Sequence, residues 1–220
     1  MHGHGKNSWG ADWSASKLAE QTRPSKRQLE IQLAKLRTLD KPDLKLEQYP
    51  VSPEAAAELL YMAGFEHDDL KGHVIDLGTG TGRLAIGAAL MGSEHVIGVD
   101  MDPDSLSLAR TNAEAARVEV EWVLSEIDSV TGTYDTVVMN PPYGTRTIHA
   151  DTRFLGRAFQ LAPVTYSIHK SSTRGFLKQY VERHGRRIDE ARSLTMKIPH
   201  MFSFHSRRWS GVEVDLCRIL

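Results

Sequence analysis

The chain has 220 residues, of which 40% are hydrophobic and 25% are charged, and this is the composition of one ordinary soluble globular domain. No apolar run approaches the roughly 18 residues of a membrane span, and no charged-then-apolar leader opens the chain, so we expect a cytoplasmic protein with no membrane partner. The single cysteine, Cys217, excludes an internal disulfide and a multi-cysteine zinc site, and we expect no metal site.

The net charge of -1 conceals an uneven distribution of charge along the chain. Residues 1–145 contain 13 Lys and Arg against 22 Asp and Glu, whereas residues 146–220 contain 14 against 6 and five of the ten histidines. A basic final third indicates a polyanionic partner, although a merely solvated charged surface would give the same count.

The first helical pattern begins at Ser25. Residues 1–24 are rich in Gly, Ser, Lys and His without apolar periodicity, so we predict a disordered extension there and a single domain over residues 25–220. Leucines at helical spacing predict a helix over residues 25–39, with Ser25 as its N-cap. A second helix is predicted from Pro53 to about residue 62, with Ser52 as its N-cap.

A strand over residues 73–77 leads into the glycine-rich turn Gly78-Thr79-Gly80-Thr81-Gly82 and then into a helix over about residues 84–91. A second strand follows over residues 96–99 and ends in Asp100. This order is one βαβ unit of the kind that binds an adenosine-containing cofactor. Glycines let the backbone approach the ligand, and an acid at the end of the second strand accepts a hydrogen bond from a ribose hydroxyl.

Asp76, inside the first strand, indicates which cofactor binds. A carboxylate just ahead of the glycines would repel a pyrophosphate, but it suits a ligand with a cationic end and no phosphate. S-adenosylmethionine has an ammonium and a sulfonium group and no phosphate. The pattern therefore favours a methyltransferase over a dehydrogenase.

The rest of the chain completes a seven-stranded sheet. We predict a helix from Pro103, strands over residues 118–123, 134–139, 162–168, 193–198 and 212–219, and a helix over residues 174–183. Glu126 and Asp128 follow the third strand, where an acid can accept a hydrogen bond from an adenine amino group. The expected fold is α/β, with a mostly parallel sheet and helices on both faces.

The fourth strand runs into Asn140-Pro141-Pro142-Tyr143, and the double proline ends it. Because the carboxyl ends of parallel strands line the ligand crevice, we expect Asn140 to lie near Asp100 and the glycine-rich turn. The Asn140 amide oxygen and a backbone carbonyl can accept the two N–H bonds of an amino group, and the Tyr143 ring can stack on a planar target. The alternative is a proline turn that only closes a core strand.

The glycine-rich turn with Asp76 and the tetrapeptide that begins at Asn140 resemble the motifs of class I methyltransferases that modify exocyclic amines and amides, which implies a Rossmann-like fold. Three further segments narrow the resemblance, namely Leu46-Glu47-Gln48-Tyr49-Pro50, Tyr166-Ser167-Ile168-His169-Lys170-Ser171-Ser172-Thr173-Arg174 and Val212-Glu213-Val214-Asp215-Leu216. With them, residues 25–220 resemble the methyltransferase-like family that makes N6-methyladenosine in small-subunit ribosomal RNA.

The resemblance implies roles for individual residues. The positions that match cofactor-binding residues are Gln48, Val51, Asp76, Gly78, Gly80, Thr81, Gly82, Arg83, Asp100, Glu126 and Ile127. The positions that match the catalytic motif are Asn140, Pro141, Pro142 and Tyr143. Eukaryotic members of the family work with a small zinc-containing activator subunit that pairs along a sheet edge, so such a partner is also implied.

We therefore expect an S-adenosylmethionine-dependent enzyme that forms N6-methyladenosine in RNA. His169, Lys170 and Arg174, with Arg207 and Arg208, are expected to form a phosphate-contacting rim around the crevice. One alternative is a protein glutamine N5-methyltransferase, which would use the same tetrapeptide on an amide. Another is a catalytically idle RNA-binding or scaffold protein.

Overall fold

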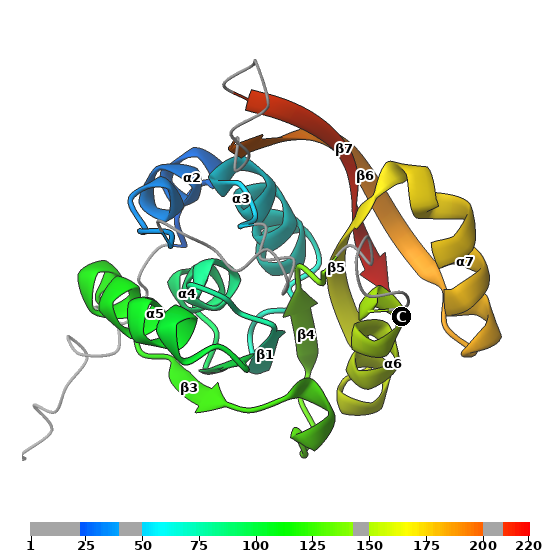
Figure 1. Cartoon of the computed structure of the whole chain (residues 1–220), viewed down its shortest axis with the longest axis horizontal. Helices are drawn as coiled ribbons and strands as arrows, with labels where there is room; N and C mark the ends of the chain where they lie inside the picture. The colour runs from blue at the N-terminus through cyan, green and yellow to red at the C-terminus, as the bar shows by residue number, and fades with distance from the viewer. Residues whose placement is uncertain (1–22, 40–49, 143–149, 200–208) are drawn as a thin grey trace, which may run out of the picture.

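The computed structural model describes residues 23–39, 50–142, 150–199 and 209–220 (Figure 1). Nearly all of the predicted N-terminal extension lies outside the described residues, as do Gln48, Tyr143, Arg207 and Arg208. Within the described ranges, no helix combines the length and the apolar character that crossing a membrane requires.

Seven strands form one sheet in the order β3-β2-β1-β4-β5-β7-β6. Their bounds are β1 His73–Leu77, β2 His95–Asp100, β3 Glu121–Leu124, β4 Thr136–Met139, β5 Val164–Lys170, β6 Ile188–Pro199 and β7 Trp209–Ile219. Pairing is parallel from β3 through β5, whereas β7 lies antiparallel to both β5 and β6. The predicted seven-stranded, mostly parallel sheet is therefore confirmed.

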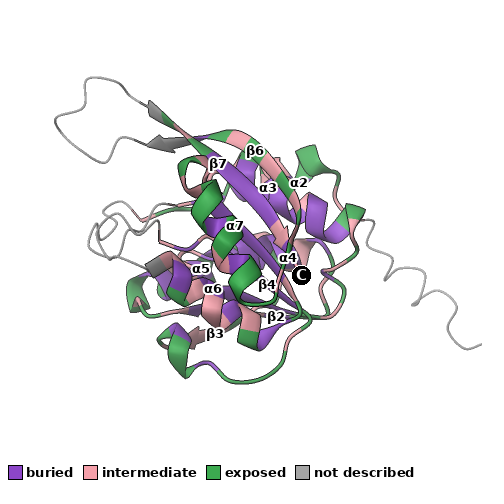
Figure 2. Ribbon diagram, turned by 90° about the vertical axis from the view of Figure 1, so that its right-hand side faces the viewer, coloured by how far each residue is buried: buried purple, intermediate pink, exposed green. Residues whose placement is uncertain are grey.

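Helices cover both faces of the sheet, as predicted. They are α2 Lys26–Ala34, α3 Pro53–Tyr61, α4 Arg83–Leu90, α5 Pro103–Ala116, α6 Ala150–Leu161 and α7 Arg174–Arg183, with short turns η2 Met62–Glu66, η3 Ile127–Ser129 and η4 Ser171–Thr173. One core cluster joins α2, α3 and α4 to Val74 and Val138, and the other joins α6 and α7 to Ile75 and Val137. Since neighbouring residues of β1 and β4 point into opposite clusters, both faces of the sheet are buried. Figure 2 shows the buried strands inside and exposed residues on α7 outside.

The two predicted helix starts are confirmed. Ser25 forms a capping box with Gln28 at the start of α2, and the Ser52 hydroxyl accepts a hydrogen bond from the Ala55 N–H at 3.1 Å at the start of α3. These bonds satisfy N–H groups that the first helical turn leaves without an intrahelical partner. α2 is shorter than predicted, because it ends at Ala34 and residues 36–39 follow it in a non-helical path.

Several strand boundaries differ from the prediction, and one helix was not predicted. β4 begins at Thr136 rather than at residue 134, β5 spans Val164–Lys170 rather than 162–168, and β7 begins at Trp209 rather than at residue 212. β3 begins at Glu121 rather than at residue 118, because only Glu121–Leu124 pair with β2. β6 spans Ile188–Pro199 rather than 193–198, because β7 pairs with it along its whole length. α6 was not predicted at all, and it packs on the sheet face that also carries α7.

Candidate functional site

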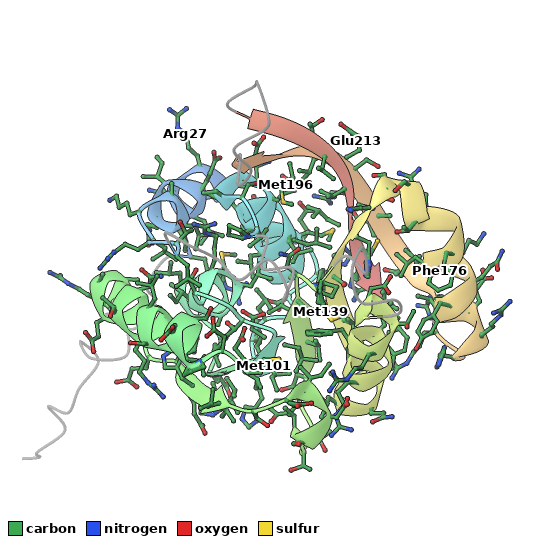
Figure 3. The ribbon with its side chains drawn as sticks, in the orientation of Figure 1. Arg27, Met101, Met139, Phe176, Met196 and Glu213 are labelled. Carbon is green, nitrogen blue, oxygen red and sulfur yellow. The ribbon has the colours of Figure 1, made fainter. Side chains whose placement is uncertain are left out.

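The candidate site lies at the carboxyl edge of β1, β2 and β4. Leu77 at the end of β1 pairs with Val99 of β2 and with Met139, the last residue of β4. The residues that follow these strands, among them Gly78, Asp100 and Asn140, therefore reach the same edge. Met139 and Met101 mark the ends of β4 and β2 in Figure 3.

The glycine-rich turn wraps tightly around this edge. Gly78, Gly80 and Gly82 have φ angles of 69°, 55° and 88°, values that favour glycine because it has no Cβ. The Thr79 N–H donates to the Val99 carbonyl at 2.9 Å and so fastens the turn to β2. A Cβ added to Gly80 would meet no atom within 4 Å, so this part of the turn borders open space that a ligand can fill.

Asp100 is joined to the glycine-rich turn. Its Oδ2 accepts a hydrogen bond from the Gly80 N–H at 2.7 Å, and its Oδ1 accepts one from the Asp102 N–H at 3.0 Å. Burial raises the pKa of Asp100, and backbone hydrogen bonds from Asp102, Gly80 and Met101 favour its charged form. A carboxylate can accept about four hydrogen bonds, so Asp100 can still accept one from a hydroxyl group of a ligand.

Asp76 lies beneath the turn and is 1% exposed. Its Oδ2 accepts hydrogen bonds from the Thr79 hydroxyl at 2.6 Å and the Ala85 N–H at 3.0 Å. Its Oδ1 is buried and has no hydrogen-bond partner among the described residues. Burial, and to a smaller extent the Asp100 carboxylate, raise the pKa of Asp76 to about 7. An oxygen in this state is suited to a cationic or hydrogen-bond-donating ligand.

Arg83 and Val51 meet at the start of α4. The Arg83 guanidinium donates to the Val51 carbonyl and, at 3.5 Å, to the Leu36 carbonyl. Burial lowers the pKa of Arg83 to about 10. In the described contacts Arg83 therefore joins α4 to the chain next to α2 and α3, and the cofactor role of Arg83 and Val51 stays a prediction.

Glu126 follows β3, the strand next to β2, and immediately precedes η3. Its carboxylate is 60% exposed and forms an ion pair of 2.8 Å with Arg153 of α6, which also binds Asp128 at 2.7 Å. The adjacent Ile127 is 6% exposed. A ligand that binds Glu126 would therefore share this carboxylate with the Arg153 guanidinium.

Two residues of α6 lie at this site without having been predicted there, Arg153 and Phe154. A Cβ added to Gly78 would lie 2.8 Å from the Phe154 ring, so this ring packs directly on the glycine-rich turn. The available signal was the apolar period from Phe154 through Leu155, Ala158 and Phe159, which follows a helical face.

The tetrapeptide begins where β4 ends. Pro141 is buried, and Asn140 and Pro142 are partly buried. The structure therefore brings Asn140 to the same edge as the glycine-rich turn and Asp100, as predicted from the parallel order of the strands.

The predicted phosphate-contacting rim does not agree with the structure at His169. This residue is 3% exposed, its Nε2 lies 2.7 Å from the Ser167 hydroxyl, and burial lowers its pKa to about 4. A neutral, buried ring cannot contact a phosphate from solvent, so His169 is a structural residue. β5 is a central strand covered on both faces, and for this reason its polar residues point inward.

Arg174 is half exposed but already has an anionic partner. Its Nε and Nη2 donate to the two carboxylate oxygens of Asp215, both at 2.7 Å, and Ser171 and Ser193 also donate to Asp215. The hydrogen bond from Arg174 lowers the pKa of Asp215 to about 2. Lys170, at the end of β5, is partly exposed.

Comparison with known proteins gives the family. The methyltransferase small domain family matches residues 54–163. The rRNA N(6)-adenosine-methyltransferase Mettl5 of Drosophila melanogaster is 33% identical over 201 residues, which cover 87% of this chain and 94% of the relative. The uncharacterized protein MJ0284 of Methanocaldococcus jannaschii is 34% identical over 88% of this chain and 93% of the relative. The solved structure of PH1948 from Pyrococcus horikoshii superposes with a TM-score of 0.82 at 34% identity, covering 89% of this chain and 97% of that one.

Proposed function

This chain belongs to the methyltransferase small domain family, and from this premise we propose that it methylates N6 of adenosine in RNA. It is an S-adenosyl-L-methionine-dependent methyltransferase with a Rossmann-like fold. The observation that carries the proposal is the meeting of Asn140 with the glycine-rich turn at one sheet edge, in a chain matched by an rRNA N(6)-adenosine-methyltransferase over 94% of that relative's length.

The residues of the crevice fit S-adenosyl-L-methionine. The buried Asp76 Oδ1, which none of the described residues binds, suits a donor with positive charge, and open space beside Gly80 admits a ligand close to the backbone. Asp76, the glycine-rich turn and Asp100 would hold this cofactor. When bound, it supplies an electrophilic methyl group.

The proposed role of Asn140 is to prepare the target amino group. The N6 lone pair of adenine is delocalised into the ring, so the amino group is a poor nucleophile. Hydrogen bonds from its two N–H groups to Asn140 Oδ1 and to the Pro141 carbonyl localise the lone pair toward the methyl donor. The N–C bond would form as the S–C bond breaks, the electron pair of the S–C bond would leave with the thioether, and the methylated nitrogen would then lose its extra proton to water. Fixed dipoles and positioning would supply the rate enhancement, and no strong base is needed to begin the transfer.

We further propose small-subunit ribosomal RNA as the target. The support is the resemblance carried by the three segments around Gln48, His169 and Asp215, together with the basic final third of the chain. The target adenosine must leave its stack to reach the crevice, at a cost of about a few kcal/mol in a duplex.

A small zinc-containing activator subunit is the protein partner that we propose. The sheet ends in β3 on one side and β6 on the other, so pairing along a sheet edge would use one of these strands. Hydrogen exchange with and without the subunit would identify the strand, because a paired edge is protected. If the complex forms and neither β3 nor β6 exchanges more slowly in it than in the protein alone, pairing along a sheet edge is contradicted.

The decisive experiment is transfer of labelled methyl groups from S-adenosyl-L-methionine to separated RNAs and proteins of a cell extract. The expected product is N6-methyladenosine in small-subunit ribosomal RNA. If N6-methyladenosine appears in another RNA instead, the proposed reaction is correct and the proposed small-subunit target is wrong. Label on protein glutamine would favour the glutamine methyltransferase, and absence of cofactor binding would favour the idle scaffold.

A further inference from the structure

Asn112 of α5 forms a three-way hydrogen-bonded junction, although it lies outside the site described above. It is 2% exposed. Its Nδ2 donates to the carbonyls of Thr81 and Arg37, both at 2.9 Å, and its Oδ1 accepts from the Arg37 N–H at 2.9 Å. Both N–H bonds of the amide are therefore used, one on the glycine-rich turn and one on the chain that follows α2.

The bond to Thr81 acts on the middle of the glycine-rich turn. The neighbouring Gly82 N–H donates to the Thr79 carbonyl at 2.9 Å, and the Gly80 N–H donates to Asp100. The Asn112 bond ties the Thr81 carbonyl to α5. The turn is thus held by two elements, by β2 through Asp100 and by α5 through Asn112.

A second link runs in parallel. Arg83, the first residue of α4 and the first after the turn, donates to the carbonyls of Leu36 and Val51. α2 itself is packed into the core through Leu29 and Leu33, both 0% exposed. The segment of residues 26–37 is therefore fastened to the carboxyl-terminal end of the turn twice, through Asn112 at Thr81 and through Arg83 just after Gly82.

Helix packing alone does not account for this junction. Leucine side chains already hold α2 on α4 through apolar contact. A buried amide adds little net stability over an apolar residue of the same shape, but it fixes the directions of the backbone groups that it binds. Here those groups belong to two segments, and one of them is the cofactor turn.

We propose that Asn112 is a positioning residue that couples the docking of residues 26–37 to cofactor binding at the glycine-rich turn. The inference rests on the proposed cofactor role of that turn. Because such coupling is reciprocal, an ordered α2 segment strengthens cofactor binding, and bound cofactor stabilises the α2 segment to the same degree.

The first test separates positioning from folding. Asn112→Leu removes all three bonds, whereas Asn112→Asp keeps the acceptor for the Arg37 N–H and loses both donors. Both variants lose the one bond to the turn, at the Thr81 carbonyl, so both should weaken binding of S-adenosyl-L-homocysteine about tenfold, the loss expected for about one buried hydrogen bond. KM for the methyl donor should rise by a similar factor with kcat within about twofold. Thr111→Ala, on the exposed side of the same helix, is the matched control and should bind normally.

The second test uses reciprocity and needs no activity. Hydrogen exchange of residues 26–37 should slow when S-adenosyl-L-homocysteine binds the unaltered protein, and this response should be clearly smaller in Asn112→Leu at saturating ligand, where the Arg83 link remains. Residues 174–183 of α7 serve as the internal reference. Unchanged affinity in folded Asn112→Leu and Asn112→Asp, or exchange of residues 26–37 that ignores the ligand, would overturn the coupling while leaving the methyltransferase intact. Failure of the unaltered protein to bind the ligand would overturn both proposals.

Discussion

Asn140 is the residue on which the proposed chemistry depends. It lies at the end of β4, and the prolines that follow it restrict the backbone, so its amide is presented from a rigid position. Asn140→Ala should lower single-turnover methyl transfer to RNA by about 10²–10³-fold, the loss typical of one preorganised electrostatic group. Cofactor affinity, measured by calorimetry, should change little because Asp76, Asp100 and the glycine-rich turn are intact.

The product of the same reaction tests the direction of attack. If Asn140→Ala retains most of its activity, or if the unaltered enzyme methylates a ring nitrogen or a ribose, the amine-directed mechanism is wrong. Tyr143→Phe is the comparison variant, and it should have a mild effect because stacking requires the ring and not its hydroxyl.

Asp76 makes cofactor binding depend on pH. Burial raises its pKa to about 7, so the carboxyl group is neutral below that pH and charged above it. Affinity for a cationic ligand should therefore rise as the pH increases from about 5.5 to 7, by up to about tenfold per pH unit. Calorimetric titration with S-adenosyl-L-methionine measures this, and Asp76→Asn should bind weakly with a flat profile. A flat profile in the unaltered protein would contradict the role of Asp76.

The raised pKa of Asp76 should make the protein without ligand less stable as the pH rises, whereas cofactor affinity should increase. The unfolded carboxyl group loses its proton near pH 4, whereas the folded one keeps it until about pH 7, so the folded state binds more protons between these values. The contribution of Asp76 to the free energy of unfolding therefore falls as pH rises through this window. Denaturant unfolding of Asp76→Asn should lack that fall. An equal fall in both proteins would assign it to another group.

At the scale of elements, local signals account for what could be predicted. The glycine-rich turn, the Ser52-Pro53 helix start and the α7 helix depend on neighbouring residues, and the structure has them where predicted. α6 has no cap signal like that of Ser52, so only its apolar period could have revealed it. The burial of His169 and the Arg174–Asp215 pair depend on the order β4-β5-β7, which no local pattern contains.

The contact between α6 and the glycine-rich turn gives an element-scale prediction. Gly78→Ala should lower the free energy of unfolding by about 1–3 kcal/mol because of the positive φ at this position. The added methyl group would also collide with the Phe154 ring, which should lower the free energy of unfolding further. Gly80→Ala is the matched control, since it has a positive φ but open space around the added methyl group. Denaturant unfolding should give a larger loss for Gly78→Ala.

A double variant isolates the collision. Phe154→Ala should cost stability alone, yet it should reduce the loss caused by Gly78→Ala, because the ring that the methyl group strikes is gone. If the losses of unfolding free energy in the two single variants simply add in the double variant, the Phe154 ring moves aside without strain and does not stabilise the conformation of the turn.

At the scale of the whole molecule, the basic final third is partly neutralised by the acidic first part. Arg192 of β6 binds Glu58 at 3.0 Å and Glu190 at 2.6 Å and also pairs with Glu66. Arg218 of β7 binds Asp69 at 2.8 Å. Some of the positive charges in the final third therefore have a structural role, because Arg192 and Arg218 join β6 and β7 to the region before β1. Composition alone could not separate these arginines from residues that face RNA.

The position of each positive charge relative to Asn140 predicts which of them affect RNA binding. Lys170 lies at the end of β5, beside the strand that carries Asn140, so a bound phosphate can release a counterion there. Lys170→Ala should lower the slope of log affinity against log salt by about one while cofactor affinity stays constant. Arg192→Gln, with a charge used internally, should leave the slope unchanged and reduce the free energy of unfolding by about 1–3 kcal/mol. Equal effects of the two variants on the slope would mean that RNA is attracted by net charge and not by the rim beside Asn140.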